Sequence, residues 1–225
     1  NKHRKSGKPL IEPLYTVEDA ESSLSLFQTV EFNEQFTIPN AGVQFSFIEN
    51  GHLLGSGSVN LIITEGSRRI KICFTGDIGR MKPNMLRTPQ PFPQADYILC
   101  ESTYGDRLHD DSDYSAIDIA KIIHETCIEK KGKVLVPAFS IGRTQEILYA
   151  LDVLYGIDPT LKIPVYVYSP LSTKGTSIHR KYLPLFNESM QEYFQKDPTP
   201  FDFPFLHFIQ DAEQSKALNT SPEPC

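Results

Sequence analysis

The sequence contains no tryptophan, only three methionines, and no apolar run that approaches the ~20 residues needed to span a bilayer. The charged N-terminal segment NKHRKSGKPL is followed by no apolar stretch, so neither a signal peptide nor a membrane-spanning segment is predicted. Hydrophobic residues make up 40% of the chain and charged residues 22%, which is typical of a folded globular protein rather than a disordered one. We therefore expect a cytoplasmic globular protein with no membrane association.

Several catalytic motifs are also missing. No GxSxG nucleophile elbow and no GxxxxGK[ST] loop occur, which leaves serine hydrolases and P-loop NTPases without support. The glycine-rich GSGS at 55–58 lacks the lysine of a phosphate loop and is interpreted as a tight turn. The four cysteines form no CxxC pair, so buried free thiols are favoured over disulfides or zinc ligands at Cys73, Cys100, Cys127 and Cys225.

The balance of charge gives no support for a nucleic-acid partner. Lys and Arg together number 22 and Asp and Glu 28, which gives a formal net charge of −6. Proteins that hold nucleic acid through counterion release are usually basic over the binding face. An acidic total still permits a local basic groove, so charge alone neither supports nor excludes RNA as a partner.

The first half of the chain has the pattern of an antiparallel sheet. Alternating apolar and polar residues predict strands at 43–49 (VQFSFIE), 59–64 (VNLIIT) and 70–75 (IKICFT). The Glu65-Gly66-Ser67 sequence between the last two predicts a hairpin turn. A short amphipathic helix is predicted before them, at 18–27, and a fourth strand after them, at 96–101.

The hydrophobic period changes near residue 106. Beyond it, helices are predicted at 113–131, 143–155 and 173–186, alternating with strands at 133–137, 163–168 and 205–209. This alternation implies βαβ crossovers and a parallel sheet. The predicted fold class is therefore α/β, with one domain over residues 1–105 and a second over 106–225.

Three polar residues follow apolar strands in small, glycine-rich turns, where a rigid scaffold lets the backbone approach a ligand. They are His52 in NGHLLGSGS, Asp77 in FTGDIGR and Glu101 in LCESTYG. Imidazole and carboxylate groups suit zinc or a similar divalent ion, and a carboxylate can bridge two metals. Taken singly, His52 and Asp77 are more simply explained as ordinary turn residues. Three further histidines, at 124, 179 and 207, are interpreted as core or surface groups.

A fourth candidate is the loop at 138–143, which joins a predicted strand to a predicted helix. Its amides, with Ser140 and Arg143, could receive a phosphate or an RNA backbone at the helix N-terminus. The alternative is an ordinary helix start with Ser140 as the N-cap.

Five ordered blocks resemble one known family. GHLLGSGS and FTGDIGR resemble the third and fourth metallo-β-lactamase motifs, and ESTYG resembles the acidic motif that opens the β-CASP region. VLVPAFSIGRTQEILYAL and VYVYSPLSTKGTSIHRKY resemble βα segments of that region. The chain is thus similar, from about Leu14 onward, to bacterial β-CASP ribonucleases of the metallo-β-lactamase superfamily. The resemblance implies the second half of an αββα sandwich over 1–105 and a Rossmann-like β-CASP domain over 106–225.

The resemblance also implies a chemistry, namely zinc-dependent phosphodiester hydrolysis of RNA at a site with two zinc ions. His52 would bind the first zinc, Asp77 would bridge both, and Glu101 would orient a histidine that acts as general acid. The family's HxHxDH motif and its C-terminal histidine motifs do not occur in this sequence. We therefore expect this chain alone to bind zinc weakly and to be inactive. Asn50 stands where the family usually has a small apolar residue, so local packing should differ there.

Two other functions remain open at this point. A β-CASP subunit that has lost its catalysis could serve as an RNA-binding scaffold. A metallo-hydrolase for a small substrate, such as a lactam or thioester, is a further alternative, although the segment after residue 106 favours a polymer. Apolar strand surface left uncovered in the first half predicts either a homodimer or poor solubility.

Overall fold

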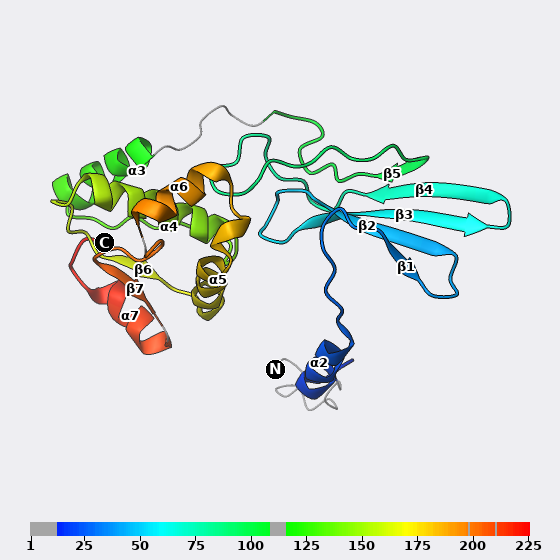
Figure 1. Cartoon of the computed structure of the whole chain (residues 1–225). Coiled ribbons are helices and arrows are strands. Elements are labelled where there is room, and N and C mark those ends of the chain that lie inside the picture. Colours follow the sequence, from blue (N-terminus) through cyan, green and yellow to red (C-terminus); the bar gives the residue numbers. More distant parts are fainter. Residues whose placement is uncertain (1–12, 109–115, 198, 210) are drawn as a thin grey trace.

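The computed structural model describes residues 13–108, 116–197, 199–209 and 211–225. A sheet half and a helical half lie side by side in Figure 1. The first half forms a five-stranded sheet whose strands lie in chain order. These strands are β1 (Phe36–Ile38), β2 (Val43–Glu49), β3 (Gly57–Glu65), β4 (Arg68–Phe74) and β5 (Tyr97–Leu99).

The register of the sheet confirms the predicted hairpin. Strands β1 to β4 pair antiparallel, and β5 joins β4 in parallel. Glu65 pairs with Arg68, which leaves Gly66 and Ser67 as a two-residue turn. Gly66 has a φ of 59°, a conformation that glycine adopts without steric penalty. The predicted strands at 43–49, 59–64 and 70–75 are thus confirmed, and the one at 96–101 is shorter than predicted.

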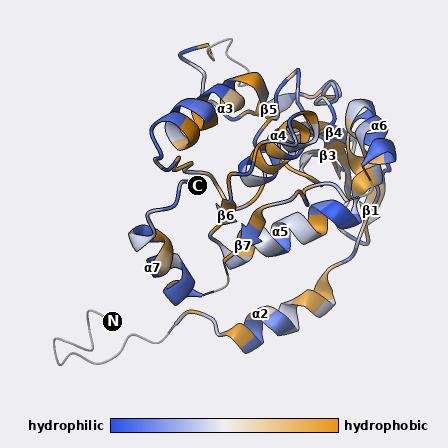
Figure 2. Ribbon diagram, turned by 90° about the vertical axis from the view of Figure 1, so that its left-hand side faces the viewer, coloured by the Kyte–Doolittle hydropathy of each residue, from blue (hydrophilic) through white to orange (hydrophobic). Residues whose placement is uncertain are grey.

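The predicted N-terminal helix is also present. Helix α2 (Val17–Ser23) continues into one 3-10 turn, η1 (Leu24–Leu26). Thr16 caps α2 by accepting from the Asp19 amide, while the Asp19 carboxylate accepts from the Thr16 amide, the reciprocal arrangement of a capping box. All residues of α2 and η1 are exposed, and Figure 2 shows an apolar stretch at one end of this segment.

The second half is helical around a small parallel sheet. Strands β6 (Val165–Val167) and β7 (Leu206–Phe208) pair in parallel, which confirms the α/β fold class. The helices are α3 (Ala116–Ile123) with a π-helical continuation η2 (His124–Glu129), α4 (Arg143–Ile157), α5 (Pro170–Lys181), η3 (Leu183–Leu185), α6 (Glu188–Lys196) and α7 (Ala212–Thr220). Helices α6 and α7 were not predicted. Within the described ranges, no helix is both long and apolar enough to cross a membrane.

The strand predicted at 133–137 is wrong. Residues 131–139 have no regular secondary structure, and Leu135 and Val136 are exposed. The Val134 amide donates to the Cys225 carbonyl at 2.9 Å, but the described residues offer this segment no ladder of such bonds. An apolar run becomes a strand only where a neighbouring strand accepts its amides, and that neighbour cannot be seen in local sequence.

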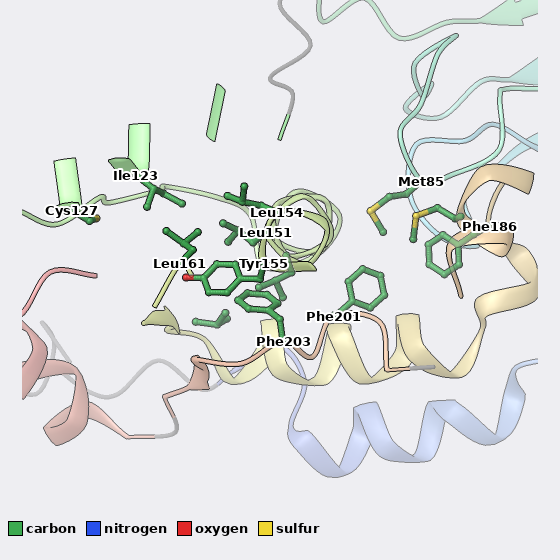
Figure 3. Packing of buried hydrophobic residues seen from close by; sticks show 13 residues of the cluster. Met85, Ile123, Cys127, Leu151, Leu154, Tyr155, Leu161, Phe186, Phe201 and Phe203 are labelled. Atoms are coloured by element: carbon green, nitrogen blue, oxygen red, sulfur yellow. The ribbon is translucent and has the colours of Figure 1, made fainter. Parts of the chain in front are cut away.

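The apolar core lies in the helical half, around α4 (Figure 3). Its fully buried members include Phe186, Phe201 and Leu148, and each such side chain contributes about 1.5–3 kcal/mol through removal from water. One member, Met85, comes from the sheet half and lies beside Phe186 in Figure 3. The remaining members are Ile123, Cys127, Leu151, Leu154, Tyr155, Leu161, Val167, Met190 and Phe203.

The segment around Met85 connects the two halves. The Asn187 amide donates to the Met85 carbonyl at 3.0 Å, and Arg87 donates to the Pro184 carbonyl at 3.0 Å. Arg87 also lies 3.7 Å from the Glu49 carboxylate at the end of β2. Residues 83–87 are therefore fixed to η3 and α6 on one side and to the sheet on the other.

All four cysteines are free thiols, as predicted. Cys73 and Cys127 are buried, and desolvation raises the pKa of both thiols. Cys100 is exposed, which differs from the prediction that the thiols are buried. It follows β5, the edge strand that no further described strand covers.

Candidate functional site

His52 and Asp77 lie in neighbouring turns at one end of the five-stranded sheet. His52 follows β2 and Asp77 follows β4, and the ends of both strands pair with the beginning of β3, which lies between them. The His52 Nε2 and Asp77 Oδ2 atoms are 3.8 Å apart. Their side chains are 43% and 72% exposed, so both are accessible to a ligand. The structure thus brings together two residues that are 25 positions apart in the chain.

The turn that carries His52 is fixed by one serine. The Ser56 hydroxyl accepts from the amides of His52 and Leu53, at 3.1 and 2.9 Å. Gly51 and Gly55 have φ values of 66° and 82°, which let the chain reverse tightly around this hydroxyl. The interpretation of 55–58 as a tight turn holds only in part, because Gly55 lies in the turn while Gly57 and Ser58 already begin β3. Ser56 adds a contact that the sequence pattern did not show.

Glu101 holds the turn that carries Asp77. One carboxylate oxygen accepts from the Ile78 amide at 2.8 Å, and the other from the Thr103 amide at 3.3 Å. The Ile78 bond, followed by the bonds from Thr103, keeps the pKa of Glu101 below its usual value. The Glu101 amide in turn donates to the Thr75 hydroxyl at 3.1 Å. Glu101 is therefore ionised at neutral pH and attached to both ends of the Asp77 turn.

The loop at 138–143 begins α4 differently from the capping alternative. The N-cap of α4 is Gly142, with a φ of 82°, and its amide donates to Gln145 Oε1 at 2.8 Å. Ser140 as the N-cap is therefore wrong: its hydroxyl lies 3.0 Å from the hydroxyl of Ser169. Ser169 is itself the N-cap of α5, accepting from the Ser172 amide. The beginnings of α4 and α5 thus meet at Ser140.

Arg143 lies at the first position of α4 and is partly engaged. Its Nη1 donates to Glu146 at 2.7 Å, while about half of its side chain is exposed. A guanidinium carries five N–H donors, so one carboxylate does not exhaust its capacity for an anion. Gln145 is fully buried and donates to the Thr176 hydroxyl at 3.1 Å, which ties α4 to α5. Nothing in the sequence pattern marked Gln145.

The Ser140–Arg143 loop lies directly against the His52 turn. A Cβ atom placed on Gly142 would be 2.6 Å from Leu53 Cδ2, so the two segments are in close contact at this glycine. Leu54, the next residue, packs against the core of the helical half. The loop that carries Ser140 and Arg143 and the turn that carries His52 therefore lie against each other, although they come from different halves of the chain.

Comparisons with known proteins relate the chain to one family. A Beta-Casp domain model matches residues 144–225. The chain is 33% identical to Ribonuclease TTHA0252 of Thermus thermophilus over 218 residues, 96% of this chain and 48% of the relative. The chain belongs to the β-CASP branch of the metallo-β-lactamase superfamily.

Eukaryotic proteins are similar over shorter parts of their length. Identity is 29% over 212 residues with Endoribonuclease YSH1 of Yarrowia lipolytica, covering 93% of this chain and 25% of the relative. It is 30% over 192 residues with Cleavage and polyadenylation specificity factor 73 of Drosophila melanogaster, covering 84% and 27%. This β-CASP chain therefore spans between a quarter and a half of the relatives it matches.

The donor set can be tested against the zinc that this family implies. Imidazole and carboxylate are suitable zinc ligands, but a catalytic zinc ion usually has three protein ligands. Within the part of the chain that the structure describes, no group of three His, Cys, Asp or Glu side chains could hold a metal ion. His52 and Asp77 are suitable as members of a larger ligand set, and by themselves they do not complete one.

Proposed function

We propose that this β-CASP chain belongs to a zinc-dependent phosphodiesterase that hydrolyses RNA. The observation that carries the proposal is the approach of His52 Nε2 and Asp77 Oδ2 to 3.8 Å at one end of the sheet. Relatives over most of the chain are named ribonucleases and endoribonucleases, which supports RNA as the substrate. The chain spans at most about half of these relatives, so the proposal concerns the activity of the whole protein.

Each candidate residue has a distinct proposed role. His52 and Asp77 would each supply a zinc ligand, and further ligands would come from outside the described residues. Bound zinc would stabilise charge on the phosphate and lower the pKa of the attacking water. Glu101, ionised and attached to the Ile78 amide, keeps the Asp77 turn in place, and its remaining acceptor capacity suits a histidine that protonates the leaving oxygen.

The substrate would be positioned by the neighbouring loop. Ser140 and Arg143 lie at the beginning of α4, against the His52 turn, where a hydroxyl and a guanidinium suit phosphate oxygens. A phosphate placed there would be close to the metal-binding turn. This arrangement favours a phosphodiester over a lactam or thioester, because only the phosphodiester has an anionic reacting group for Arg143 to bind.

The first test measures zinc and ribonuclease activity. For this chain alone, elemental analysis after dialysis against a weak chelator should give well under one zinc per chain, and no RNA cleavage should be detected. A longer protein that carries an HxHxDH motif before residue 1 should bind two zinc ions and cleave RNA. In that protein His52→Ala should lower cleavage at least 100-fold, because a ligand is lost.

His124→Ala is the matched control for this test. His124 is another exposed histidine beside a carboxylate, 3.2 Å from Glu129, but it lies on η2 outside the candidate site. Its replacement should leave zinc content and cleavage unchanged.

Two other results would support the alternative functions. RNA binding without zinc and without cleavage would show a scaffold subunit, and zinc-dependent turnover of a lactam or thioester alone would show a small-substrate hydrolase.

We also propose that the chain forms a homodimer. The edge strand β5 presents Tyr97, Ile98 and Leu99, and each of these side chains is more than half exposed. An apolar edge strand favours pairing with another chain. Light scattering coupled to size-exclusion chromatography should give twice the 25.4 kDa chain mass. Ile98→Lys should return the protein to a monomer, and a monomeric wild type would contradict the proposal.

A further inference from the structure

Asn50 lies between β2 and the turn that carries His52, and it is only 2% exposed. Its backbone contacts both turns of the site. The Asn50 amide donates to the Ser56 carbonyl at 3.3 Å, which closes the His52 turn. The Asn50 carbonyl accepts from the Gly79 amide at 2.8 Å, just beyond Asp77. The backbone of one residue therefore joins the two turns.

The Asn50 side chain repeats this connection with both of its polar atoms. Its Nδ2 donates to the Thr75 carbonyl at 3.0 Å, two residues before Asp77. Its Oδ1 accepts from the Ser56 hydroxyl at 2.6 Å and from the His52 amide at 3.4 Å. The carboxamide thus donates toward the Asp77 turn and accepts from the His52 turn.

The two turns are in contact around this side chain and leave it little freedom. A Cβ atom on Gly79 would lie 2.1 Å from the Gly51 carbonyl oxygen, and one on Gly76 would lie 3.4 Å from Asn50 Nδ2. Burial makes the hydrogen bonds of Asn50 energetically significant, because any polar atom left without a partner there loses its hydration as well. The connection therefore depends on a side chain of this shape with one donor and one acceptor.

We propose that Asn50 is a positioning residue that holds the His52 turn against the Asp77 turn and so sets the separation of the two candidate ligands. The link between the turns follows from the geometry, and its importance for zinc rests on the proposed function. Aspartate has the same shape as asparagine but lacks the donor. Asn50→Asp would place a carboxylate oxygen against the Thr75 carbonyl while keeping an acceptor for Ser56.

The test compares Asn50→Asp with Asn60→Asp in this chain, by amide hydrogen exchange measured with NMR. Asn60 is a second buried asparagine in the same sheet, and within the described residues its side chain has no hydrogen-bond partner. Both variants introduce a buried carboxylate, but only Asn50→Asp breaks the link. We expect exchange at the His52 and Gly79 amides to rise at least tenfold relative to β3 amides in Asn50→Asp, and not in Asn60→Asp.

A milder pair, Asn50→Ala and Asn60→Ala, decides the question if a buried carboxylate prevents folding. Faster exchange spread evenly over all strands, or no change at His52 and Gly79, would overturn the proposal. A separate zinc titration of the longer protein should show at least tenfold weaker binding for Asn50→Asp than for Asn60→Asp. Absence of zinc binding in the wild type would count against the proposed function, while the exchange data would still decide the role of Asn50.

Discussion

The two halves of the molecule bury different kinds of side chain. Among the described residues up to 108, most buried side chains are polar: Asn50, Ser58, Asn60 and Thr75, with Cys73 and Met85 as the apolar ones. In the described helical half, aromatic and aliphatic side chains gather around α4 and outnumber the buried polar ones, which are Gln145, Asp152, Ser172, Thr176 and His179. The sheet half therefore orders its functional end by hydrogen bonds between turns, and the helical half owes its order to apolar burial.

This difference suits the chemistry of a binding site. Hydrogen bonds have defined directions, so a buried Asn or Ser can fix the path of a turn while His52 and Asp77 stay exposed to a ligand. Apolar packing stabilises the fold more strongly, but it buries the side chains that it orders. The two turns that carry His52 and Asp77 are thus ordered by hydrogen bonds. Through Leu53 and Leu54 the His52 turn also contacts the helical half, which is ordered by apolar packing.

The largest effect should come from the apolar core. Phe186→Ala removes a fully buried ring from the helical half, which should lower the free energy of unfolding by about 3–5 kcal/mol. Phe139→Ala, at an exposed phenylalanine in the loop before α4, is the matched control and should change it by less than about 0.5 kcal/mol. Urea denaturation followed by circular dichroism measures both. Equal effects would mean that the core around α4 does not dominate stability.

A smaller but more local effect is expected where the turns meet. Gly79→Ala would place a Cβ atom 2.1 Å from the Gly51 carbonyl and 2.8 Å from the His52 amide, so backbone must shift. We expect a loss of about 2–3 kcal/mol, with altered NMR shifts at residues 51–56 and 75–79. Gly156→Ala is the control, because nothing lies within 4 Å of its added Cβ and alanine favours a helix. A tolerated Gly79→Ala would show that the turns can separate.

The smallest expected effect depends on pH and concerns Asp152, a buried carboxyl of α4. Burial raises its pKa from 3.8 to about 6, and the charge of Asp197 adds to this, although the Phe201 amide donates to it at 2.9 Å. Because the folded pKa lies above the unfolded one, the contribution of this group to stability is complete below about pH 4. It is lost as the pH rises through about 6.

Asp152→Asn should therefore gain stability relative to wild type between pH 4 and pH 8, by about 1–3 kcal/mol, as measured by urea denaturation at each pH. Asp158→Asn is the comparison variant. Hydrogen bonds from Thr160, the hydroxyl first, lower the pKa of Asp158 from its usual 3.8, so its contribution to stability is present above that value and is lost only as the pH falls below it. The stability difference between Asp158→Asn and wild type should therefore stay nearly constant from about pH 5 to pH 8. A gain across that range like the one expected for Asp152→Asn would contradict the assignment of burial as the cause at Asp152.

The strands and helices that the sequence predicted correctly are those that depend on patterns in neighbouring residues. Alternation in 43–49 and 70–75 and the glycine at position 66 are sufficient for two strands and a hairpin. The segment at 133–137 was mistaken for a strand because pairing depends on a distant neighbour. Helices α6 and α7 were missed because their sequences, ESMQEYFQK and AEQSKALNT, are largely polar. The boundary near residue 106 stays a prediction.

For the site, the sequence identified the exposed side chains but not what holds them. His52, Asp77 and Glu101 were candidates because they follow apolar strands in small, glycine-rich turns, and the structure brings His52 and Asp77 together. The metal, catalytic and phosphate-binding roles stay predictions. Asn50 attracted notice only as a departure from the family, and Ser56 and Gln145 not at all. Their importance lies in contacts with distant backbone, which no local pattern records.

Met85 makes the helical half dependent on an earlier part of the chain. Its side chain packs in the core beside Phe186, and its carbonyl accepts a hydrogen bond from the Asn187 amide. A polypeptide that began at residue 106 would have a methionine-sized hole in its core, equivalent to about 2–5 kcal/mol. Any exchange of the β-CASP half between relatives must therefore transfer residues 83–87 as well, so the unit that recombines is discontinuous in sequence.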